Sequence, residues 1–338
     1  MDQTVGITPK GLVYVTDSEP GIRRQRAGRG FCYRLPDGTV LRDAAERKRI
    51  ERLAIPPAYR DVWICIDERG HLQATGYDDR SRKQYRYHPE WSAFRNHLKF
   101  STLAEFGASL PRIRRRLRAD LQAEAGDLDF TLAAIVTLVD AAAIRAGSPG
   151  AASENGTFGV TTLLKRHLKL GDEGIRLDYT AKGGKRVRMS LRQRRLHQIL
   201  EKIADLPGRK LFQWRDSDGA CRPVESGQVN AYLAAISGGS HTLKTFRTWS
   251  GTLAAFETGL AALAGERAPT IREMTQAAAG TLHNTPAVCR NSYIHPEVIG
   301  LSETDPKVGR KLLKKLTEAG PVAEMRVAES RLLTFLGG

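Results

Sequence analysis

The 338-residue sequence predicts an α+β protein with a small β-rich domain over residues 1–96 and a larger, mainly α-helical domain over residues 97–338. Two observations support this class. The first part contains short β-forming runs separated by turn residues. In the second part apolar residues recur at helical spacing, interrupted by one hairpin pattern. The length also suits two domains.

Short strands and turns dominate the first domain. Hairpins are expected around Pro36-Asp37-Gly38 and around Asp67-Glu68-Arg69-Gly70, because both turns lie between β-forming runs. Residues 46–53 predict a short helix. The basic, glycine-broken stretch from Arg23 to Gly30 is interpreted as a solvated lead-in or a phosphate contact. The expected strands are residues 31–34, 39–41, 62–66 and 71–75.

The run from Arg80 to His88 alternates cations with aromatic residues. Arginine and lysine neutralise phosphates, glutamine reads a base edge or a sugar, and tyrosine stacks on bases. An exposed edge strand protected by charge would have a similar composition. We expect DNA contacts from this run. The candidate DNA-binding residues are Arg82, Lys83, Gln84, Tyr85 and Tyr87.

Helical periodicity marks most of the second domain. Leu110, Ile113 and Leu117 form a core stripe beside an arginine-rich flank. Residues 130–144 are almost wholly apolar and predict a buried helix with Arg145 at its C-terminal end. This arginine either satisfies the last carbonyls or is held still to bind an anionic transition state. Further helices are expected over residues 192–206, 226–236, 243–263, 271–281, about 305–318 and 322–336.

Two lysine-containing motifs follow the buried helix. Residues 175–181 and 186–190 predict a hairpin with Lys182-Gly183-Gly184-Lys185 at its tip. The tip is either a flexible solvated turn or a mobile lysine delivered into a groove. In the helix expected over residues 243–263, Lys244 and Arg247 lie three residues apart and should share a face outside the core stripe.

Residues 282–296 predict the end of one helix, a break and a short second helix that carries Tyr293. Asn284 or Thr285 can cap the second helix, and Pro286 suits its first turn. A tyrosine phenol can act as a nucleophile when cations hold an electrophile beside it. Because the chain has 9 tyrosines, this stretch alone favours an ordinary half-buried aromatic residue.

The composition favours a polyanionic partner. Lys plus Arg number 53 and Asp plus Glu 37, and the resulting net charge of +16 suits DNA, RNA or an anionic membrane. No run approaches the roughly 18 apolar residues of a membrane span, and no signal peptide is recognisable. The 4 cysteines are scattered and no phosphate-binding loop motif occurs. We therefore expect nucleic acid as partner, no metal site, no cofactor and a cytoplasmic location.

Taken together, these motifs resemble the type IB DNA topoisomerases, in particular the small poxvirus-like branch that also occurs in bacteria. The resemblance covers nearly the whole chain, and the order of the motifs makes it specific. It implies a catalytic domain of the kind shared with tyrosine recombinases. In chain order the motifs are Ile55–Tyr59, Asp61–Ile64, Gln73–Gly76, Arg82–Tyr87, Ile144–Gly147, Glu154–Gly159, Ala181–Lys185, Lys244–Trp249 and Asn284–Tyr293.

The resemblance also implies roles for three residues. Tyr293 matches the nucleophile, which attacks a DNA phosphodiester and becomes linked to a 3′ phosphate. Arg145 and Arg247 match the two catalytic arginines, which hold the non-bridging oxygens of that phosphate. A cut and resealed strand lets the DNA relax without ATP or a required metal.

The remaining catalytic positions leave two questions open. Lys182 matches the general acid that protonates the leaving 5′ oxygen, with Lys185 as the competing candidate, and Lys244 matches an auxiliary lysine. Poxvirus members have a histidine nine residues before the tyrosine, where this chain has Asn284, as some bacterial relatives do. An amide can still donate a hydrogen bond to a phosphoryl oxygen. His283 lies next to it, but one position turns a helical side chain by about 100°.

The implied partner is double-stranded DNA, clamped by both domains of a monomer that is associated with the nucleoid. A tyrosine recombinase is the nearest alternative, but such enzymes usually have His-x-x-Arg where this chain has Lys244-x-x-Arg247. A catalytically silent DNA-binding protein is the second alternative, and Asn284 is the feature that favours it.

Overall fold

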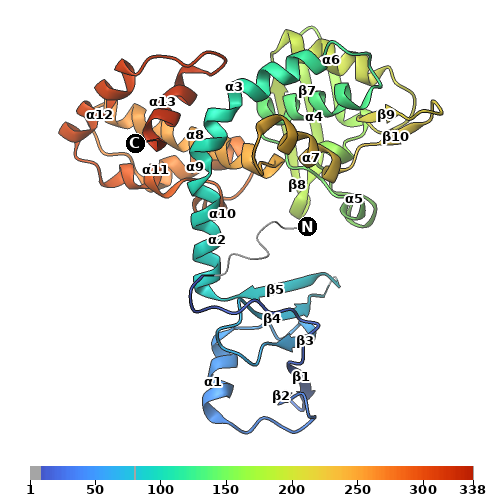
Figure 1. Ribbon diagram of the computed structural model, residues 1–338, viewed down its shortest axis with the longest axis vertical. Coiled ribbons are helices and arrows are strands. Elements are labelled where there is room, and N and C mark those ends of the chain that lie inside the picture. Colours follow the sequence, from blue (N-terminus) through green and yellow to red (C-terminus); the bar gives the residue numbers. More distant parts are fainter. Residues whose placement is uncertain (1–8, 80, 338) are drawn as a thin grey trace. The chain divides into compact units, whose positions relative to one another are not determined.

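The computed structural model describes residues 9–79 and 81–337, which form two compact units that divide between Lys99 and Phe100 (Figure 1). Residues 1–8, Arg80 of the predicted DNA-binding run and Gly338 lie outside the described residues. The boundary expected after residue 96 falls inside helix α2 (Pro89–Ser101), which the sequence reasoning did not predict.

The N-terminal unit contains a five-stranded antiparallel sheet with the strand order β2-β1-β3-β4-β5. Ile22, Val62, Ile64 and Ala74 of the sheet pack with Ile50 of α1 in a small core. Strand β5 lies at one edge of the sheet. The elements are β1 (Ile22–Ala27), β2 (Gly30–Arg34), α1 (Ala44–Arg52), β3 (Arg60–Ile64), β4 (Leu72–Tyr77) and β5 (Lys83–Tyr87).

Residues 23–30 are mostly exposed, as expected, but most of this stretch is not an irregular lead-in, because residues 23–27 belong to strand β1. The Arg24 guanidinium donates to the carbonyls of Ile55, Pro56 and Tyr59, at 3.2, 3.0 and 2.7 Å. These bonds join β1 to a turn whose two prolines, Pro56 and Pro57, have no N–H groups of their own. The expected hairpin at residues 31–41 is present, but its second arm forms only an isolated bridge.

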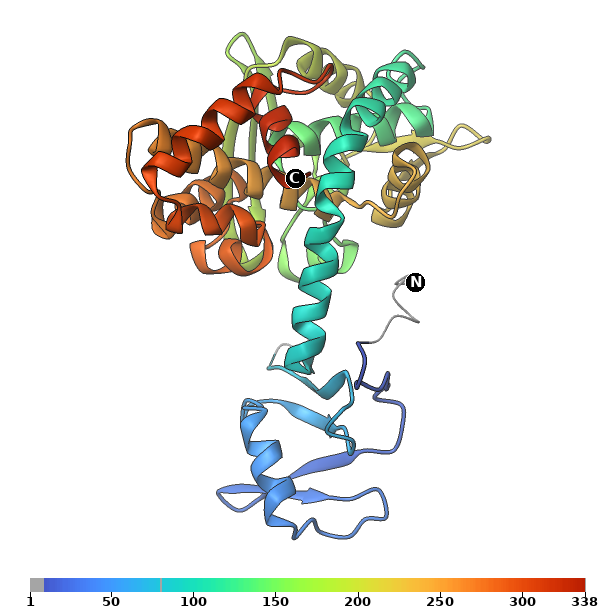
Figure 2. The same cartoon turned by 60° about the vertical axis from the view of Figure 1, so that its left-hand side comes forward.

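The C-terminal unit is mainly helical and contains a three-stranded antiparallel sheet with the order β6-β7-β8. Figure 1 shows the late helices α12 and α13 (red) on one side of this unit and the sheet (yellow-green) on the other, and in the turned view of Figure 2 the sheet lies behind these helices. This architecture confirms the predicted α+β class. The elements are α3 (Leu103–Asp120), α4 (Leu128–Ala142), α5 (Pro149–Asn155), β6 (Leu168–Gly171), β7 (Gly174–Ala181), β8 (Lys185–Leu191), α6 (Arg194–Ala204), β9 (Gln213–Arg215), β10 (Cys221–Pro223), α7 (Ser226–Ser237), α8 (Leu243–Ala264), α9 (Ile271–Leu282), α10 (Pro286–Ser292), α11 (Pro296–Gly300), α12 (Pro306–Glu318) and α13 (Val327–Leu336).

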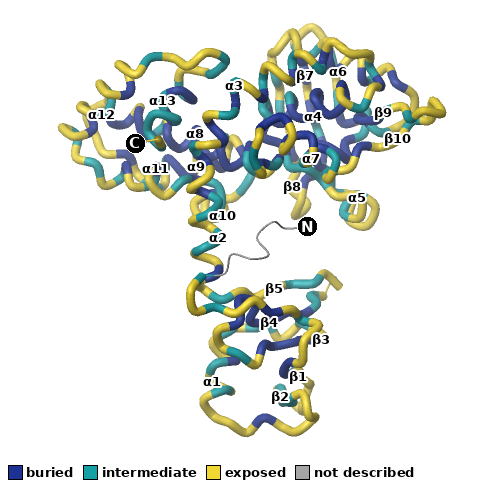
Figure 3. The backbone as a smooth tube through the Cα atoms, viewed as in Figure 1, coloured by how far each residue is buried: buried dark blue, intermediate teal, exposed yellow. Residues whose placement is uncertain are grey.

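The core of this unit is centred on helices α4 and α8, whose buried stretches are dark blue in Figure 3. Gly107 of α3 allows a close approach to α8, since a Cβ atom there would lie 2.5 Å from the Trp249 ring. On the sheet, Leu177 and Tyr179 of β7 are buried in this core, whereas Arg176 is exposed on the outer face. The rigid core thus positions the end of α4, helix α8 and the β7–β8 hairpin.

The arginine-rich flank of α3 is tied into the structure. Arg114 bonds to Asp140 of α4 and to Glu329 of α13, with nitrogen–oxygen distances of 2.8 to 3.0 Å. Arg118 pairs with Glu324. The Glu329 carboxylate is fully buried, and the guanidiniums of Arg114 and Arg326 outweigh the effect of burial and lower its pKa to about 2. Helices α3, α4 and α13 are therefore joined by a buried ionic network.

Among the described residues, no helix has the combination of length and apolar character needed to cross a membrane.

Candidate active site

Arg247 lies on α8 with 4% of its surface exposed. Its guanidinium donates to the carbonyl of Ala143, which lies just after α4. It also donates to the carbonyl of Leu282, at the end of α9, at 3.1 Å. Its Nε atom is buried without a hydrogen-bond partner, and no described carboxylate pairs with it. Burial lowers the pKa of Arg247, while the nearby Tyr293 opposes this shift. A buried cation that lacks a counter-ion is a ready-made site for an anion.

Tyr293 lies beside this guanidinium. The Arg247 Cζ atom is 5.3 Å from the centre of the Tyr293 ring. The tyrosine is half-buried. It was expected on the short second helix, but α10 ends at Ser292 and Tyr293 is its C-terminal cap. Thr285 rather than Asn284 is the N-terminal cap of α10, since its hydroxyl accepts from the Val288 N–H at 3.4 Å.

A clip on α8 holds the main chain around Tyr293. The buried Thr252 hydroxyl donates to the Tyr293 carbonyl at 3.2 Å and accepts from the His295 N–H at 3.1 Å. Gly251 makes room for this contact, because a Cβ atom there would lie 2.8 Å from the Tyr293 carbonyl oxygen. The sequence reasoning missed both residues. The only indication in the sequence was that a small residue, Gly251, and a hydroxyl residue, Thr252, follow shortly after Arg247.

Arg145 was expected at the C-terminal end of the buried helix, but it lies beyond it. Helix α4 ends at Ala142, and Ala143 turns the chain with φ at 50°. The Arg145 carbonyl accepts from the Val160 N–H at 2.7 Å. A Cβ atom on Gly159 would lie 2.6 Å from that carbonyl oxygen, so only glycine fits there. A packed pair of loops, rather than the helix itself, therefore fixes this arginine.

Arg145 and Arg247 both affect the pKa of the same two buried side chains. Both cations lower the pKa of the buried Tyr179 phenol on β7, although burial dominates and raises it to about 12. Both also oppose the rise that burial causes in the pKa of the Cys289 thiol on α10. Tyr179 and Cys289 were not among the predicted site residues. Both side chains are buried and lie close enough to the two arginines for these charges to affect their pKa.

The hairpin tip brings one of its two lysines to the α9–α10 break. Lys185 Nζ donates to the Asn284 carbonyl at 3.2 Å, and both lysines are exposed. The Asn284 Nδ2 atom is buried and has no hydrogen-bond partner in the part of the chain that the structure describes. Burial, followed by Lys185 and Arg247, lowers the pKa of His283. Because its pKa lies below the ordinary value of 6.5, His283 is neutral at pH 7.

Lys244 differs from Arg247 in its exposure to solvent. It is exposed in the first turn of α8, whereas Arg247 is buried. The two positions are neighbours on α8, but the expectation that both lie outside the core was wrong for Arg247, which reaches inward to the carbonyls of Ala143 and Leu282. Helical spacing defines which side chains are neighbours, but not how deeply each one is covered.

The predicted DNA-binding residues of the N-terminal unit lie on or next to the edge strand β5. Arg82 and Gln84 both donate to Asp78, at 2.9 and 3.0 Å, and Lys83 pairs with Asp17. Tyr85 and Tyr87 are stacked with ring centres 6.1 Å apart, and about half of each side chain is exposed. The edge therefore combines exposed aromatic faces with cations held by carboxylates.

Among the residues that the structure describes, no three histidine, cysteine, aspartate or glutamate side chains are grouped to hold a metal ion.

Comparison with known proteins identifies the family. A model of the bacterial DNA topoisomerase IB N-terminal domain matches residues 30–78, and a model of the eukaryotic DNA topoisomerase I catalytic core matches residues 88–298. The chain is 27% identical over 299 residues to the DNA topoisomerase 1B of Acanthamoeba polyphaga mimivirus, covering 85% of this chain and 89% of that protein. The catalytic-core match takes in more than half of the chain. The resemblance inferred from the sequence is thus confirmed, and the chain belongs to the type IB DNA topoisomerases, enzymes that relax DNA.

Proposed function

We propose that Tyr293 is the nucleophile that cuts one strand of duplex DNA. Its phenolic oxygen releases its proton to water, attacks the scissile phosphorus and forms a 3′-phosphotyrosyl bond, while the bond to the 5′ oxygen breaks and that oxygen takes up a proton. The observation that carries this proposal is the buried guanidinium of Arg247, which lies 5.3 Å from the Tyr293 ring and has no carboxylate partner among the described residues.

The two arginines stabilise the negative charge that gathers on the phosphate in the transition state. A guanidinium offers planar paired donors with a permanent charge. Arg247 is already desolvated and fixed by two carbonyls, so little reorganisation accompanies the reaction. Arg145 supplies the second guanidinium from the loop after α4. The buried Nδ2 of Asn284 is the third donor, which supports a role for the amide where poxvirus relatives have histidine.

A lysine of the hairpin tip protonates the leaving 5′ oxygen, and Lys182 is the proposed acid. The exposed Lys182 needs the substrate to bring it into the site, whereas Lys185 already contacts the α9–α10 break. Lys244 is assigned an auxiliary role in moving this proton. Because the covalent bond conserves the energy of the phosphodiester, resealing needs neither ATP nor a metal.

The N-terminal domain, residues 1–96, and the catalytic domain, residues 97–338, are proposed to clamp duplex DNA as a monomer associated with the nucleoid. The net charge of +16 supports this partner. Arg82, Lys83, Gln84, Tyr85 and Tyr87 would contact the backbone and bases, with Lys185 near the cut. Each neutralised phosphate should steepen the salt dependence of binding by about 0.9 log units.

Relaxation of a negatively supercoiled plasmid in EDTA, without ATP, tests the nucleophile. The wild type should relax the plasmid, and Tyr293→Phe should bind DNA with unchanged affinity but leave it supercoiled. Relaxation by the Tyr293→Phe protein would refute the assignment. Binding without relaxation by both proteins would instead support a silent DNA-binding protein or a site-specific recombinase.

A duplex whose scissile 5′ oxygen is replaced by sulfur tests the lysines. A thiolate leaves without a proton, so the variant that lacks the general acid should recover on this substrate. We expect recovery for Lys182→Ala and little recovery for Lys185→Ala. The reverse pattern would assign the proton to Lys185.

A further inference from the structure

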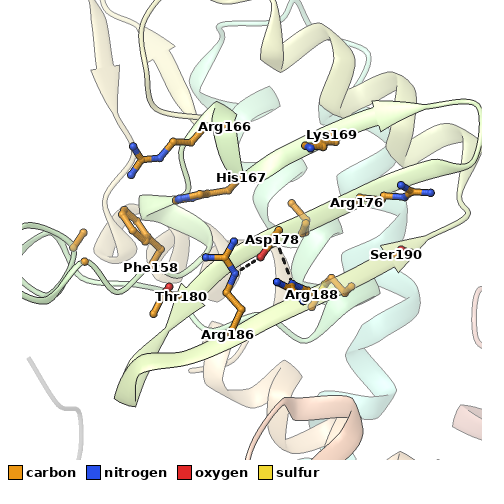
Figure 4. Close-up of a pocket in the computed structure, with 14 residues that line it drawn as sticks. Phe158, Arg166, His167, Lys169, Arg176, Asp178, Thr180, Arg186, Arg188 and Ser190 are labelled. Carbon is orange, nitrogen blue, oxygen red and sulfur yellow. Dashed lines mark ion pairs between the residues drawn. The ribbon is translucent and has the colours of Figure 1, made fainter.

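The sheet β6-β7-β8 has an outer face that the proposed chemistry does not use. A hollow of about 870 Å³ lies on this face, bordered by Phe158 and by the end of α5. Figure 4 shows Asp178 among the cationic side chains of this face. The cationic residues that line the hollow are Arg166, Lys169, Arg176, Arg186 and Arg188.

The hollow lies on the opposite side of the sheet from the two catalytic arginines. Tyr179 of β7, whose pKa is influenced by Arg145 and Arg247, is buried on the inner face. Asp178 and Thr180, its neighbours in the strand, line the hollow, because successive strand residues point to opposite faces. A ligand in the hollow and a phosphate at Arg247 would therefore occupy different sides of the sheet.

The hollow carries an excess of positive charge. Asp178 pairs with Arg186 and lies 3.5 Å from Arg188, so one carboxylate orients two guanidiniums. No described carboxylate pairs with Arg166 or Lys169, and both side chains are exposed. Burial lowers the pKa of His167 in the same wall, which leaves this imidazole neutral at pH 7. The complementary ligand is acidic.

The wall also has features that a phosphate backbone does not match. The Phe158 ring packs edge-on against His167, with ring centres 4.5 Å apart, and half-buried Met189 adds apolar surface. Asp178 would repel a phosphate, whereas a polypeptide offers N–H donors to it and carboxylates to the surrounding guanidiniums. We propose that this hollow is a docking site for an acidic, extended segment of a partner protein that carries an apolar anchor.

Fluorescence anisotropy with a labelled peptide of glutamates and two phenylalanines tests this proposal on the full chain at physiological salt. Arg166→Ala/Lys169→Ala should bind the peptide about tenfold more weakly than the wild type. The matched control is Lys202→Ala/Arg209→Ala, which removes the same charge from two exposed residues that form no ion pair with any described residue and do not line the hollow. The control should stay within about twofold of the wild type.

Three further results bear on the proposal. A peptide with glutamine in place of glutamate should not bind, and a short DNA duplex should not displace the acidic peptide. Unchanged plasmid relaxation and thermal unfolding would show that both double variants are folded. Equal losses in the two double variants, displacement by the duplex, or no binding by the wild type would each overturn the proposal.

Discussion

Replacing Thr252 by valine removes the clip between α8 and the segment that carries Tyr293. Valine keeps the shape of threonine but cannot donate to the Tyr293 carbonyl or accept from the His295 N–H, which the hydroxyl contacts at 3.2 and 3.1 Å. Thr252 is completely buried, so water does not readily replace either bond.

The expected cost follows from these two contacts. An unsatisfied buried polar group costs about 1–3 kcal/mol, so losing both bonds corresponds to about 2–4 kcal/mol if the segment relaxes partly. This rearrangement of the segment would shift Tyr293 relative to Arg247. A misplacement of about 1 Å lowers a reaction rate on the order of a hundredfold. We therefore expect Thr252→Val to cut DNA about a hundredfold more slowly, with unchanged DNA affinity.

Single-turnover formation of the covalent DNA complex measures the cleavage rate, and DNA titration of the same protein measures affinity. Thr252→Ser keeps the hydroxyl and should restore most of the rate. The matched control is Thr258→Val on the same helix, because the Thr258 hydroxyl donates only within α8, to Ala254 at 2.9 Å. A wild-type rate for Thr252→Val, an equal loss for Thr258→Val, or no rescue by serine would refute the reasoning.

Three other substitutions probe the fold and the anion site. Arg247→Ala should slow cleavage at least about a hundredfold, and sulfate should raise the melting temperature of the wild type but not of this variant, because the buried guanidinium is lost. Gly159→Ala should lower the free energy of unfolding by about 1–3 kcal/mol, since its Cβ would lie 2.4 Å from the Gly147 nitrogen. Denaturant titration should show no such loss for Gly227→Ala, which meets open space. The folded pKa of Glu329 is lowered from 4.5 to about 2, so its ionised form stabilises the fold above pH 4.5 and this contribution disappears as the pH falls toward 2. From pH 7 to pH 2 the wild type should therefore lose about 3 kcal/mol that Glu329→Gln does not lose, and equal acid sensitivity in denaturant titrations would contradict this role.

Local patterns in the sequence were enough for most of the regular elements. The helices expected over residues 226–236, 243–263 and 271–281 each differ from α7, α8 and α9 by a single residue at the C-terminal end. The β7–β8 hairpin also lies where the pattern placed it. The hydrophobic period, the capping residues and the turn residues each depend on positions only a few residues apart. A single sequence therefore contains these signals in full.

Elements without a local signal were missed. Strand β1 is rich in arginine, and its pattern resembles a solvated tail until β2 and β3 pair with it. Helix α2 begins at Pro89 and has a mixed composition that did not indicate a helix. In both cases distant contacts outweigh weak intrinsic propensity.

The sequence by itself determined the fold class, the family and the set of candidate site residues, because each depends on residue types and their order. Only the tertiary structure decided that Arg247 is buried without a counter-ion, that loops rather than α4 fix Arg145, and that Thr252 holds the Tyr293 main chain. These features join segments between 15 and 104 residues apart in the chain. Sequence spacing carries no information about such contacts, since they exist only once the packed core has brought the ends of α4, α8 and α9 together.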